Sequence, residues 1–326
     1  MQNCLDGLVG TDILSLSLSL SLSLSLSVRS YWRLLASQVV AAPNDTTPLL
    51  PPSNTDEGST SADPIDIADF GEGAMIKTRN INNINDFIKA KNEIETNSGN
   101  FVLNITSTIT VGDAEADIMP ETNTVISLRG GGTIHKSSGA YNLFYLYDPT
   151  GSKKLILRDV TLKGHTAGGN GSLVVVESGA EFEMYDGGAI TGNKTSICGA
   201  VEVGGSGTFN MYGGTISKNE ADSGNSGGVC AVEGAFNMSG GTIGGNKALN
   251  GYGGGVWVNA DIGGTFTKTG GTIYGKDAAT ESDKNIAAGD AGGHAVYAHT
   301  ISTPKYRDTT ADELIGLDSS SDDNWE

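Results

Sequence analysis

A repeat of about 27 residues runs through the second half of the chain, and it limits the possible folds more than any other feature. Each copy contains a Phe-x-Met or Phe-x-Lys element, then a glycine pair, then Thr-Ile or Ala-Ile. The phenylalanines are spaced by 27, 27 and 30 residues, at Phe182, Phe209, Phe236 and Phe266. Self-similarity at such a period is typical of solenoids, in which each repeat is one structural unit stacked on the next.

Each repeat holds three short runs in which apolar and polar residues alternate, separated by glycines. In the run TFNMY, Phe209 and Met211 lie on one side of a strand and Asn210 lies on the other. Three short strands joined at glycine corners form one turn of a parallel β-helix, and the next turn stacks on it at ~4.8 Å. The sequence therefore predicts an all-β fold, a single-stranded parallel β-helix with three strands per turn.

Equivalent residues of successive turns are expected to contact one another inside this solenoid. Burial of each Phe, Met or Ile stabilises the fold by roughly 1.5–3 kcal/mol, and no turn can bury its own inner face alone. The expected inward columns are Phe182/Phe209/Phe236/Phe266, Met184/Met211/Met238, Ile190/Ile216/Ile243/Ile273 and Val201/Val229/Val256/Val296.

Glycines and asparagines recur with the same period. Glycine pairs such as 213–214 and 240–241 fall at corners, where a positive φ or a close backbone approach excludes a side chain. Asn193, Asn219 and Asn246 each follow an inward isoleucine by three residues. Two interpretations stay open: a ladder of stacked amides, each bonded to the next, or residues that simply tolerate left-handed turns.

Both ends of the repeat region are expected to carry caps, because an exposed terminal strand is an aggregation-prone edge. Phe101 begins the first expected strand, and apolar residues at helical spacing in 84–94 predict a helix that covers this end. At the other end Lys268 replaces the column methionine, and an irregular insert at 277–290 and an acidic tail suggest a second cap. The expected segments are a cap with a helix in 65–100, the β-helix in 101–300 and a cap with the acidic tail in 301–326.

The first 64 residues differ in composition and are not expected to join the fold. Residues 14–27 alternate leucine and serine, as a CT dinucleotide repeat would encode, and a translated microsatellite that switches expression is favoured over an isolated strand. Arg29 and Arg33 precede a short apolar stretch, the order of an export signal. Residues 1–42 are therefore interpreted as a Leu-Ser repeat and leader-like segment, and 43–64 as a disordered Pro/Ser/Thr-rich linker.

Charge and cysteine content exclude several classes of function. The formal net charge is −18, which argues against a nucleic-acid partner because phosphate binding needs a Lys/Arg-rich face. No apolar run approaches the ~20 residues that a transmembrane helix requires. Of the three cysteines, Cys198 and Cys230 are interpreted as small apolar fillers, with a disulfide between them as the less favoured alternative. A monomer without metal or cofactor is expected.

The text from Gly213 to Ala248, with its GGTI and F-x-M elements, resembles the repeat-rich, right-handed parallel β-helix surface proteins of host-associated bacteria, spirochaetes among them. The pectin-lyase-like superfamily has the same architecture. GGAI at Gly187 is also similar to the chlamydial polymorphic outer-membrane adhesins, although those proteins pair it with F-x-x-N inside one unit and the one F-x-x-N here, at Phe101, lies far from it. The resemblance covers roughly residues 80–300. It implies the fold and a secreted or cell-surface, outer-membrane-associated location, but one fold of this kind carries many activities.

No set of residues predicts catalysis. Polysaccharide lyases of this fold need carboxylates that hold Ca²⁺ and a base, and hydrolases need two or three carboxylates. Two outward columns are mixed instead, reading Glu202/Cys230/Trp257/Tyr297 and Glu183/Asn210/Asn237/Thr267. Glu202 is interpreted as part of a solvated strand face, and His294 as a corner residue. Asp113, Glu115 and Asp117 are interpreted as loop acids, with Ca²⁺ binding as the alternative.

Trp257 and Tyr297 occupy equivalent outward positions of the last two clear turns and are the candidate ligand-binding residues. Aromatic rings exposed on a sheet can stack on sugars, although a single exposed Trp often packs on a neighbouring loop. We therefore expect a non-enzymatic, exported or cell-surface β-solenoid that acts as an adhesin- or antigen-like scaffold for a glycan or a host surface protein. The alternatives are a polysaccharide lyase or glycoside hydrolase on the same fold, and a structural repeat without a ligand.

Overall fold

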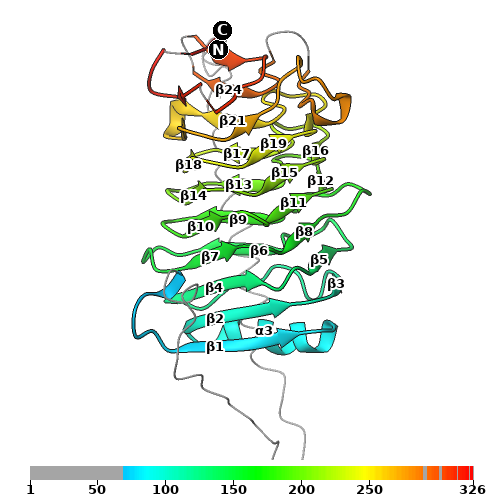
Figure 1. The fold of residues 1–326 in the computed structure, drawn as a ribbon, viewed down its shortest axis with the longest axis vertical. Helices are drawn as coiled ribbons and strands as arrows, with labels where there is room; N and C mark the ends of the chain where they lie inside the picture. The colour runs from blue at the N-terminus through cyan, green and yellow to red at the C-terminus, as the bar shows by residue number, and fades with distance from the viewer. Residues whose placement is uncertain (1–68, 289–291, 301–302, 314, 323, 326) are drawn as a thin grey trace, which may run out of the picture. The chain divides into compact units, whose positions relative to one another are not determined.

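The computed structural model describes residues 69–288, 292–300, 303–313, 315–322 and 324–325. The chain divides into the units Met1–Asp56 and Glu57–Glu326, and every described residue belongs to the second unit. The segments assigned to residues 1–42 and 43–64 lie outside the described residues. The described residues form an all-β, right-handed parallel β-helix with little helix (Figure 1), as the repeat predicts.

Three long sheets run along the solenoid, and their strands follow the order of the sequence. Sheet A contains β1 (Ile76–Ile81), β2 (Gly99–Ile105), β4 (Thr124–Arg129), β7 (Lys154–Leu157), β10 (Glu181–Met184), β14 (Thr208–Met211), β18 (Ala235–Met238), β22 (Thr265–Lys268) and β26 (Leu317–Asp318). Sheet B contains β3 (Thr108–Val111), β5 (Thr133–Lys136), β8 (Thr161–Lys163), β11 (Ala189–Thr191), β15 (Thr215–Ser217), β19 (Thr242–Gly244) and β23 (Thr272–Ile273).

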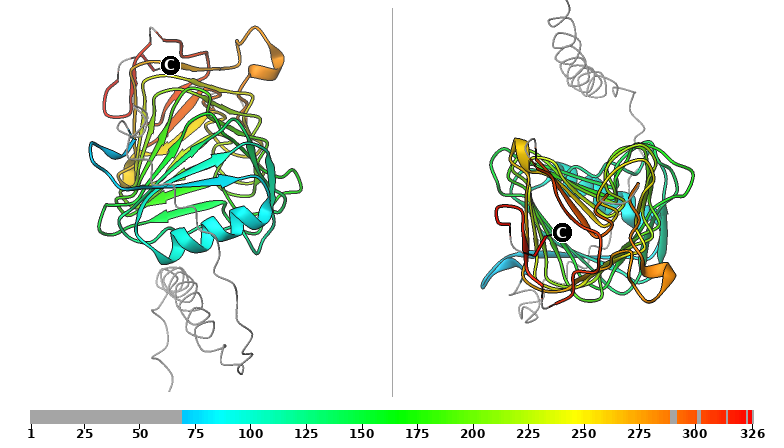
Figure 2. Two further views of the ribbon diagram at one scale, coloured as in Figure 1. Left: turned by 60° about the horizontal axis from the view of Figure 1, so that its bottom comes forward. Right: turned by 90° about the horizontal axis from the view of Figure 1, so that it is seen from above.

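Sheet C contains β6 (Phe144–Tyr147), β9 (Val174–Glu177), β13 (Val201–Val203), β17 (Val229–Ala231), β21 (Val256–Asn259), β24 (Val296–His299) and β25 (Lys305–Arg307). A short fourth sheet joins β12 (Lys194–Thr195), β16 (Glu220–Ala221) and β20 (Lys247–Ala248). Viewed along the axis, the sheets surround a single interior (Figure 2).

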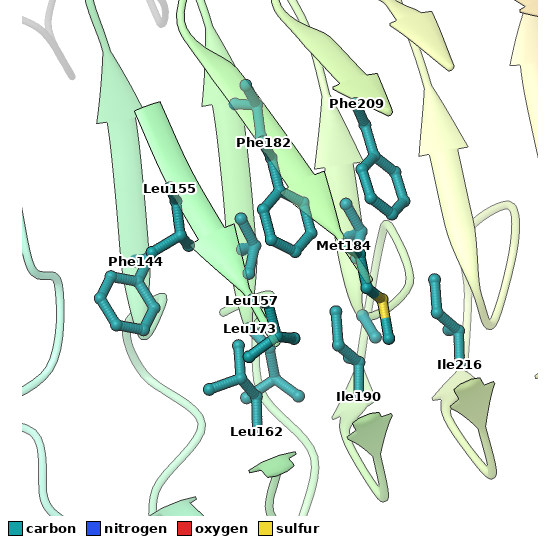
Figure 3. Close-up of a cluster of buried hydrophobic side chains, with 14 of the residues drawn as sticks. Phe144, Leu155, Leu157, Leu162, Leu173, Phe182, Met184, Ile190, Phe209 and Ile216 are labelled. Atoms are coloured by element: carbon teal, nitrogen blue, oxygen red, sulfur yellow. The ribbon is translucent and has the colours of Figure 1, made fainter. Parts of the chain in front are cut away.

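The four predicted inward columns are confirmed by the strand register. Phe182, Phe209, Phe236 and Phe266 pair in sequence, with ring centroids 4.6, 4.9 and 5.3 Å apart, and all four are fully buried. The methionine, isoleucine and valine columns keep the same register. Figure 3 shows Phe182 beside Phe209 and Ile190 beside Ile216 of the next turn, with Met184 in the same interior. Stacked aromatic pairs add about 0.5–1.5 kcal/mol each beyond the burial of their area.

Glycine is required at the corners that follow the sheet A strands. Gly214 and Gly241 have φ of +86° and +85°, a region that other residues rarely adopt. A Cβ at Gly241 would also lie 2.7 Å from the carbonyl oxygen of Gly214 in the preceding turn. Both the positive φ and the close backbone approach that were expected at the glycine pairs therefore occur here.

The asparagine column forms the amide ladder that one of the two interpretations describes. The backbone N–H of Asn193 donates to Asn219 Oδ1 at 3.0 Å, and the N–H of Asn219 donates to Asn246 Oδ1 at 3.1 Å. The side-chain amide of Asn219 also donates to Asn246 Oδ1 at 3.0 Å. Asn285, which the repeat did not indicate, continues the ladder by accepting from the backbone and side chain of Asn246. All four residues are buried, so each amide satisfies polar groups that water cannot reach.

The N-terminal end differs from the prediction in one respect. The first strand is β1, not the strand at Phe101, and β1 pairs with β2 in parallel register. It was missed because its inward positions hold Lys77 and Arg79 where later turns hold apolar residues. Arg79 Nη2 lies 2.8 Å from Glu93 Oε1 on the covering helix, which balances the charge.

The predicted helix is present as α3 (Ile84–Thr96), which lies across the end of the solenoid (Figure 2, left). Asn83 caps its N-terminus by accepting hydrogen bonds from the N–H groups of Asn85 and Asp86. Phe87, Ala90 and Ile94 are its buried residues, and they belong to the same hydrophobic core as the inward columns. The helix thus closes the open interior with apolar side chains.

At the C-terminal end the chain reverses and adds antiparallel strands. β26 pairs with β22, β25 pairs with β24, and Ala311 bridges Ile273. Lys268 is buried in the methionine column, and its Nζ donates to the carbonyl oxygens of Asp312 and Ile315. The insert expected to begin the cap instead completes the last turn, because it supplies Asn285 and a parallel bridge between Ile286 and Lys247.

The Asn219→Ala substitution tests the amide ladder. It leaves the Asn193 N–H and the Ile190 carbonyl oxygen without the partner that Asn219 supplies, and each buried group left unsatisfied costs about 1–3 kcal/mol. We expect the free energy of unfolding, measured by denaturant titration, to fall by about 2–4 kcal/mol. Asn237→Ala is the control, because Asn237 belongs to an exposed amide pair and should change stability by less than about 0.5 kcal/mol. Equal losses in the two variants would contradict a special role for the buried ladder.

Candidate functional site

The outward column of sheet C contains the two predicted ligand-binding residues. The register places Tyr145, Val175, Glu202, Cys230, Trp257 and Tyr297 in one row along the solenoid. The rings of Trp257 and Tyr297 are only 8% and 7% exposed. The expectation that they form an open platform is therefore wrong, and their role in binding sugar stays a prediction.

Neighbouring segments cover these two rings. Tyr252, in the loop before β21, stacks on Tyr297 with ring centroids 4.6 Å apart, and Tyr306 of β25 lies opposite Tyr297 in the strand pair. Trp257 stacks on His299 at 6.4 Å. Tyr252 itself is 48% exposed, so it is the aromatic ring of this cluster that a ligand would reach first.

The interpretation of the cysteines as separate apolar fillers is also wrong. Cys198 and Cys230 form a disulfide whose Cα atoms are 5.7 Å apart, within the usual range for this bond. The bond ties the loop before β13 to the outward face of β17, where both residues pack with Trp257 and Tyr297. The sequence favoured two separate apolar cysteines over a disulfide, because a spacing of 32 residues does not by itself show that the two positions lie on adjacent turns.

Glu202 does not lie on a solvated strand face as expected. It sits between Val175 and Cys230 in the row and is partly buried. Burial, together with the nearby Glu177 carboxylate, raises the pKa of Glu202 from 4.5 to about 7. Glu177 in turn accepts a hydrogen bond of 2.7 Å from the Tyr145 hydroxyl. Two carboxyl groups, those of Glu177 and Glu202, therefore share this part of the surface.

The outer face of sheet A carries a more open array, here named the polar strip, which comprises Lys154, Glu181, Glu183, Tyr185, Asn210, Tyr212 and Asn237. The Lys154 ammonium lies 2.8 Å from Glu181 Oε2 and 3.0 Å from Glu183 Oε1. Asn210 Nδ2 donates to Glu181 at 2.8 Å, and Asn237 Nδ2 donates to Asn210 at 3.0 Å. Side chains of four successive turns are thus joined by one hydrogen-bond network.

Lys154 and Tyr185 of the polar strip are each held in one protonation state at neutral pH. Burial alone lowers the pKa of Lys154, but hydrogen bonds to Glu181 and Glu183 raise it above its ordinary value. Burial and the Glu183 carboxylate raise the pKa of Tyr185 to about 12. These groups are poor proton donors or acceptors near pH 7, because an acid–base catalyst needs a pKa close to the working pH.

Two hollows of about 260 and 270 Å³ lie on this face, smaller than the roughly 300–1,000 Å³ of pockets that enclose small molecules. The second is lined by Asn210, Tyr212, Asn237, Met238, Ser239, Thr267 and Thr269. Tyr212 is 46% exposed, and its ring stands 5.0 Å from that of Tyr185. Such a surface suits contact with one side of a long molecule rather than enclosure of a small one.

The sequence identified part of the polar strip. The column Glu183, Asn210, Asn237 and Thr267 was recognised as outward, and the register confirms that these residues are neighbours. Lys154, Glu181, Tyr185 and Tyr212 were not identified as candidate binding residues. The signal was available for the tyrosines, because each directly follows the Phe-x-Met element of its repeat. For Lys154 there was none, because its turn lacks that element.

The other candidate residues make local contacts. Asp113 accepts from Ser138 Oγ, and Glu115 accepts from the N–H of Gly112 at 3.1 Å. His294 donates its N–H to Asp308 and accepts from the N–H of Ala287, as a corner residue should. Among the described residues, no three His, Cys, Asp or Glu side chains gather where they could hold a metal ion.

The pKa of Glu202 predicts a change of stability with pH. A carboxyl group whose pKa rises on folding stabilises the protein fully below its unfolded pKa of 4.5, and this contribution is lost as pH rises through about 7. Between pH 5 and 8 the loss should be about 2 kcal/mol, at about 1.4 kcal/mol per pKa unit. The measurement is the difference in unfolding free energy between wild type and Glu202→Gln at each pH. A difference that stays constant with pH would show that Glu202 titrates normally.

Comparison of the chain with protein-family models, curated proteins and solved structures finds no match. No helix in the part of the chain that the structure describes is long and apolar enough to cross a membrane. The fold assignment therefore rests on the register of the strands, and the functional assignment rests on the chemistry of the two outer faces.

Proposed function

We propose that this protein is an exported, non-enzymatic β-solenoid that acts at a cell surface as a binding scaffold, and that the polar strip on sheet A contacts a neutral glycan. One observation carries the proposal. An exposed tyrosine ring lies beside a row of amide and hydroxyl groups around an open hollow, while the strip's two carboxylates are paired with one lysine.

The chemistry of the polar strip favours a sugar over an ion or a small apolar ligand. Amides and hydroxyls donate and accept hydrogen bonds, as sugar hydroxyls do, and an aromatic face packs against the C–H face of a pyranose ring. The groups recur at the strand spacing of about 4.8 Å. A linear glycan that lies along the solenoid axis would meet equivalent groups on successive turns.

Export is supported by a feature of the described residues as well as by the N-terminal pattern. Disulfides form and persist in oxidising compartments and are rare in the cytosol, and Cys198 and Cys230 are bonded. The order of arginines and apolar residues at 29–42 is that of an export signal. The resemblance of the GGTI repeats to β-helix surface proteins of host-associated bacteria points the same way.

A carbohydrate-active enzyme is the second candidate, and the pair Glu177 and Glu202 favours it. Glycosidases separate the pKa values of two carboxyl groups so that one is an acid and the other is ionised. A pKa of about 7 for Glu202 beside Glu177 is of that kind. If the protein hydrolyses glycans, Glu202→Gln should lower the rate at least 100-fold, measured by release of reducing ends. Unchanged hydrolysis would remove Glu202 from this role.

Binding to a glycan array tests the proposed function. Tyr212→Ala removes the exposed ring of the polar strip and should weaken binding to the best glycan about ten-fold, since a stacking contact is worth about 1 kcal/mol or slightly more. Tyr147→Ala is the matched control, because Tyr147 is 47% exposed on sheet C and should leave affinity unchanged. Equal loss in both variants, or binding to no glycan, would contradict the proposal.

A further inference from the structure

Part of the outer face of sheet A is covered, although its residues point outward. The register places Val102, Ser127 and Ile156 in the same outward column as Glu183 and Asn210 of the polar strip. These three residues are 5%, 0% and 0% exposed. The N-terminal end of the described chain, which begins at Asp69, lies beside β4 at this place (Figure 1, blue).

Asp69 is bound to this face by a dense set of hydrogen bonds. Its carboxylate accepts from Ser127 Oγ at 2.6 Å, from Arg129 Nη2 at 2.8 Å and from Arg158 Nε at 3.0 Å, and it also pairs with Arg158 Nη2. The Asp69 side chain is only 1% exposed. Burial by itself raises the pKa of Asp69, but hydrogen bonds from Arg158, Ser127 and Arg129 lower it below the ordinary value.

The segment that follows Asp69 stands away from the sheet. Gly71 and Gly73 have φ of +88° and +77°, and a Cβ built at either would have no atom within 4 Å. Both residues are exposed, and so is Glu72 between them. The segment forms a turn in which the N–H of Ala74 donates to the Gly71 carbonyl oxygen at 3.4 Å, and its two unhindered glycines suit it to act as a hinge between the bound carboxylate and β1.

We infer that Ser127, Arg129 and Arg158 form a docking site for an acidic peptide, and that Asp69 occupies it as a displaceable latch. The occupant seen in the structure is itself a peptide that carries an aspartate, and two planar guanidinium groups are suited to the two oxygens of one carboxylate. A free peptide with the same side chain meets the same donors once the hinge swings away.

The site adjoins the polar strip through one residue. The Arg158 guanidinium stacks over the ring of Tyr185, with 4.1 Å from Cζ to the ring centroid, while it holds Asp69. Release of Asp69 would therefore open its contacts with Ser127, Arg129 and Arg158, beside the polar strip. The inference concerns peptide binding and does not rest on the proposed glycan binding.

A labelled, acetylated peptide of residues 69–75 tests the inference on the full chain. By fluorescence anisotropy, the peptide should bind the Asp69→Ala variant at least ten-fold more tightly than wild type, in which the latch fills the site. The same peptide with Asp69→Asn should bind that variant at least ten-fold more weakly. Glu220→Ala removes a half-buried carboxylate that pairs with Lys194 away from the latch, and this control variant should behave as wild type.

Two results would overturn the inference. One is a folded Asp69→Ala variant, with the circular dichroism of wild type, that binds the Asp and Asn peptides equally or not at all. The other is free glucuronate that binds as tightly as the peptide, because the site would then recognise any carboxylate. If Asp69→Ala does not fold, hydrogen exchange of residues 70–75 in wild type decides the matter. Excess peptide should speed this exchange by displacing the latch, and no change would overturn the inference.

Discussion

Contact between identical side chains one turn apart is the interaction on which this structure depends. A strand of four residues such as β14 buries Phe209 and Met211 only because β10 and β18 place their own phenylalanine and methionine on either side. Each turn is thus stabilised by its neighbours and not by itself. The same dependence explains why both ends are closed, by α3 at one end and by antiparallel strands at the other.

The interior was predictable from the sequence because its chemistry repeats. A repeat specifies which residues lie above one another, so the Phe, Met, Ile and Val columns followed from spacing alone. The same reasoning failed where a residue of one turn is covered by a loop that does not repeat. Trp257 and Tyr297 alternate correctly as outward residues, yet Tyr252 and β25 bury them. β1 was missed for a related reason. Arg79 occupies an inward position of this strand because Glu93 of the non-repeating helix α3 forms an ion pair with it.

Polar groups inside the solenoid are tolerated because the stack offers partners at regular intervals. From Asn193 to Asn246, the backbone N–H of each ladder residue donates to the side-chain oxygen of the next asparagine, and the amides of Asn219 and Asn246 also donate to the next side chain. Lys136 is a buried exception near the other end of that column. Its Nζ donates to the carbonyl oxygens of Tyr141 and Gly171, and Asn193 donates to the same Gly171 oxygen. Burial lowers the pKa of Lys136 to about 8, although the Asp113 and Asp117 carboxylates act in the opposite direction.

The outer faces of sheets A and C differ in how their ionisable groups are paired, and this difference bears on whether each face suits binding or catalysis. On sheet A, Lys154 pairs with two carboxylates at once, and these contacts raise its pKa above the ordinary value. On sheet C, burial and the nearby Glu177 carboxylate raise the pKa of Glu202 toward neutral pH. A regular array of hydrogen-bonded groups can bind a long ligand over several turns. Acid–base catalysis instead requires one group whose pKa lies near the working pH. The polar strip therefore fits a binding surface, whereas the raised pKa of Glu202 on sheet C suits proton transfer near pH 7.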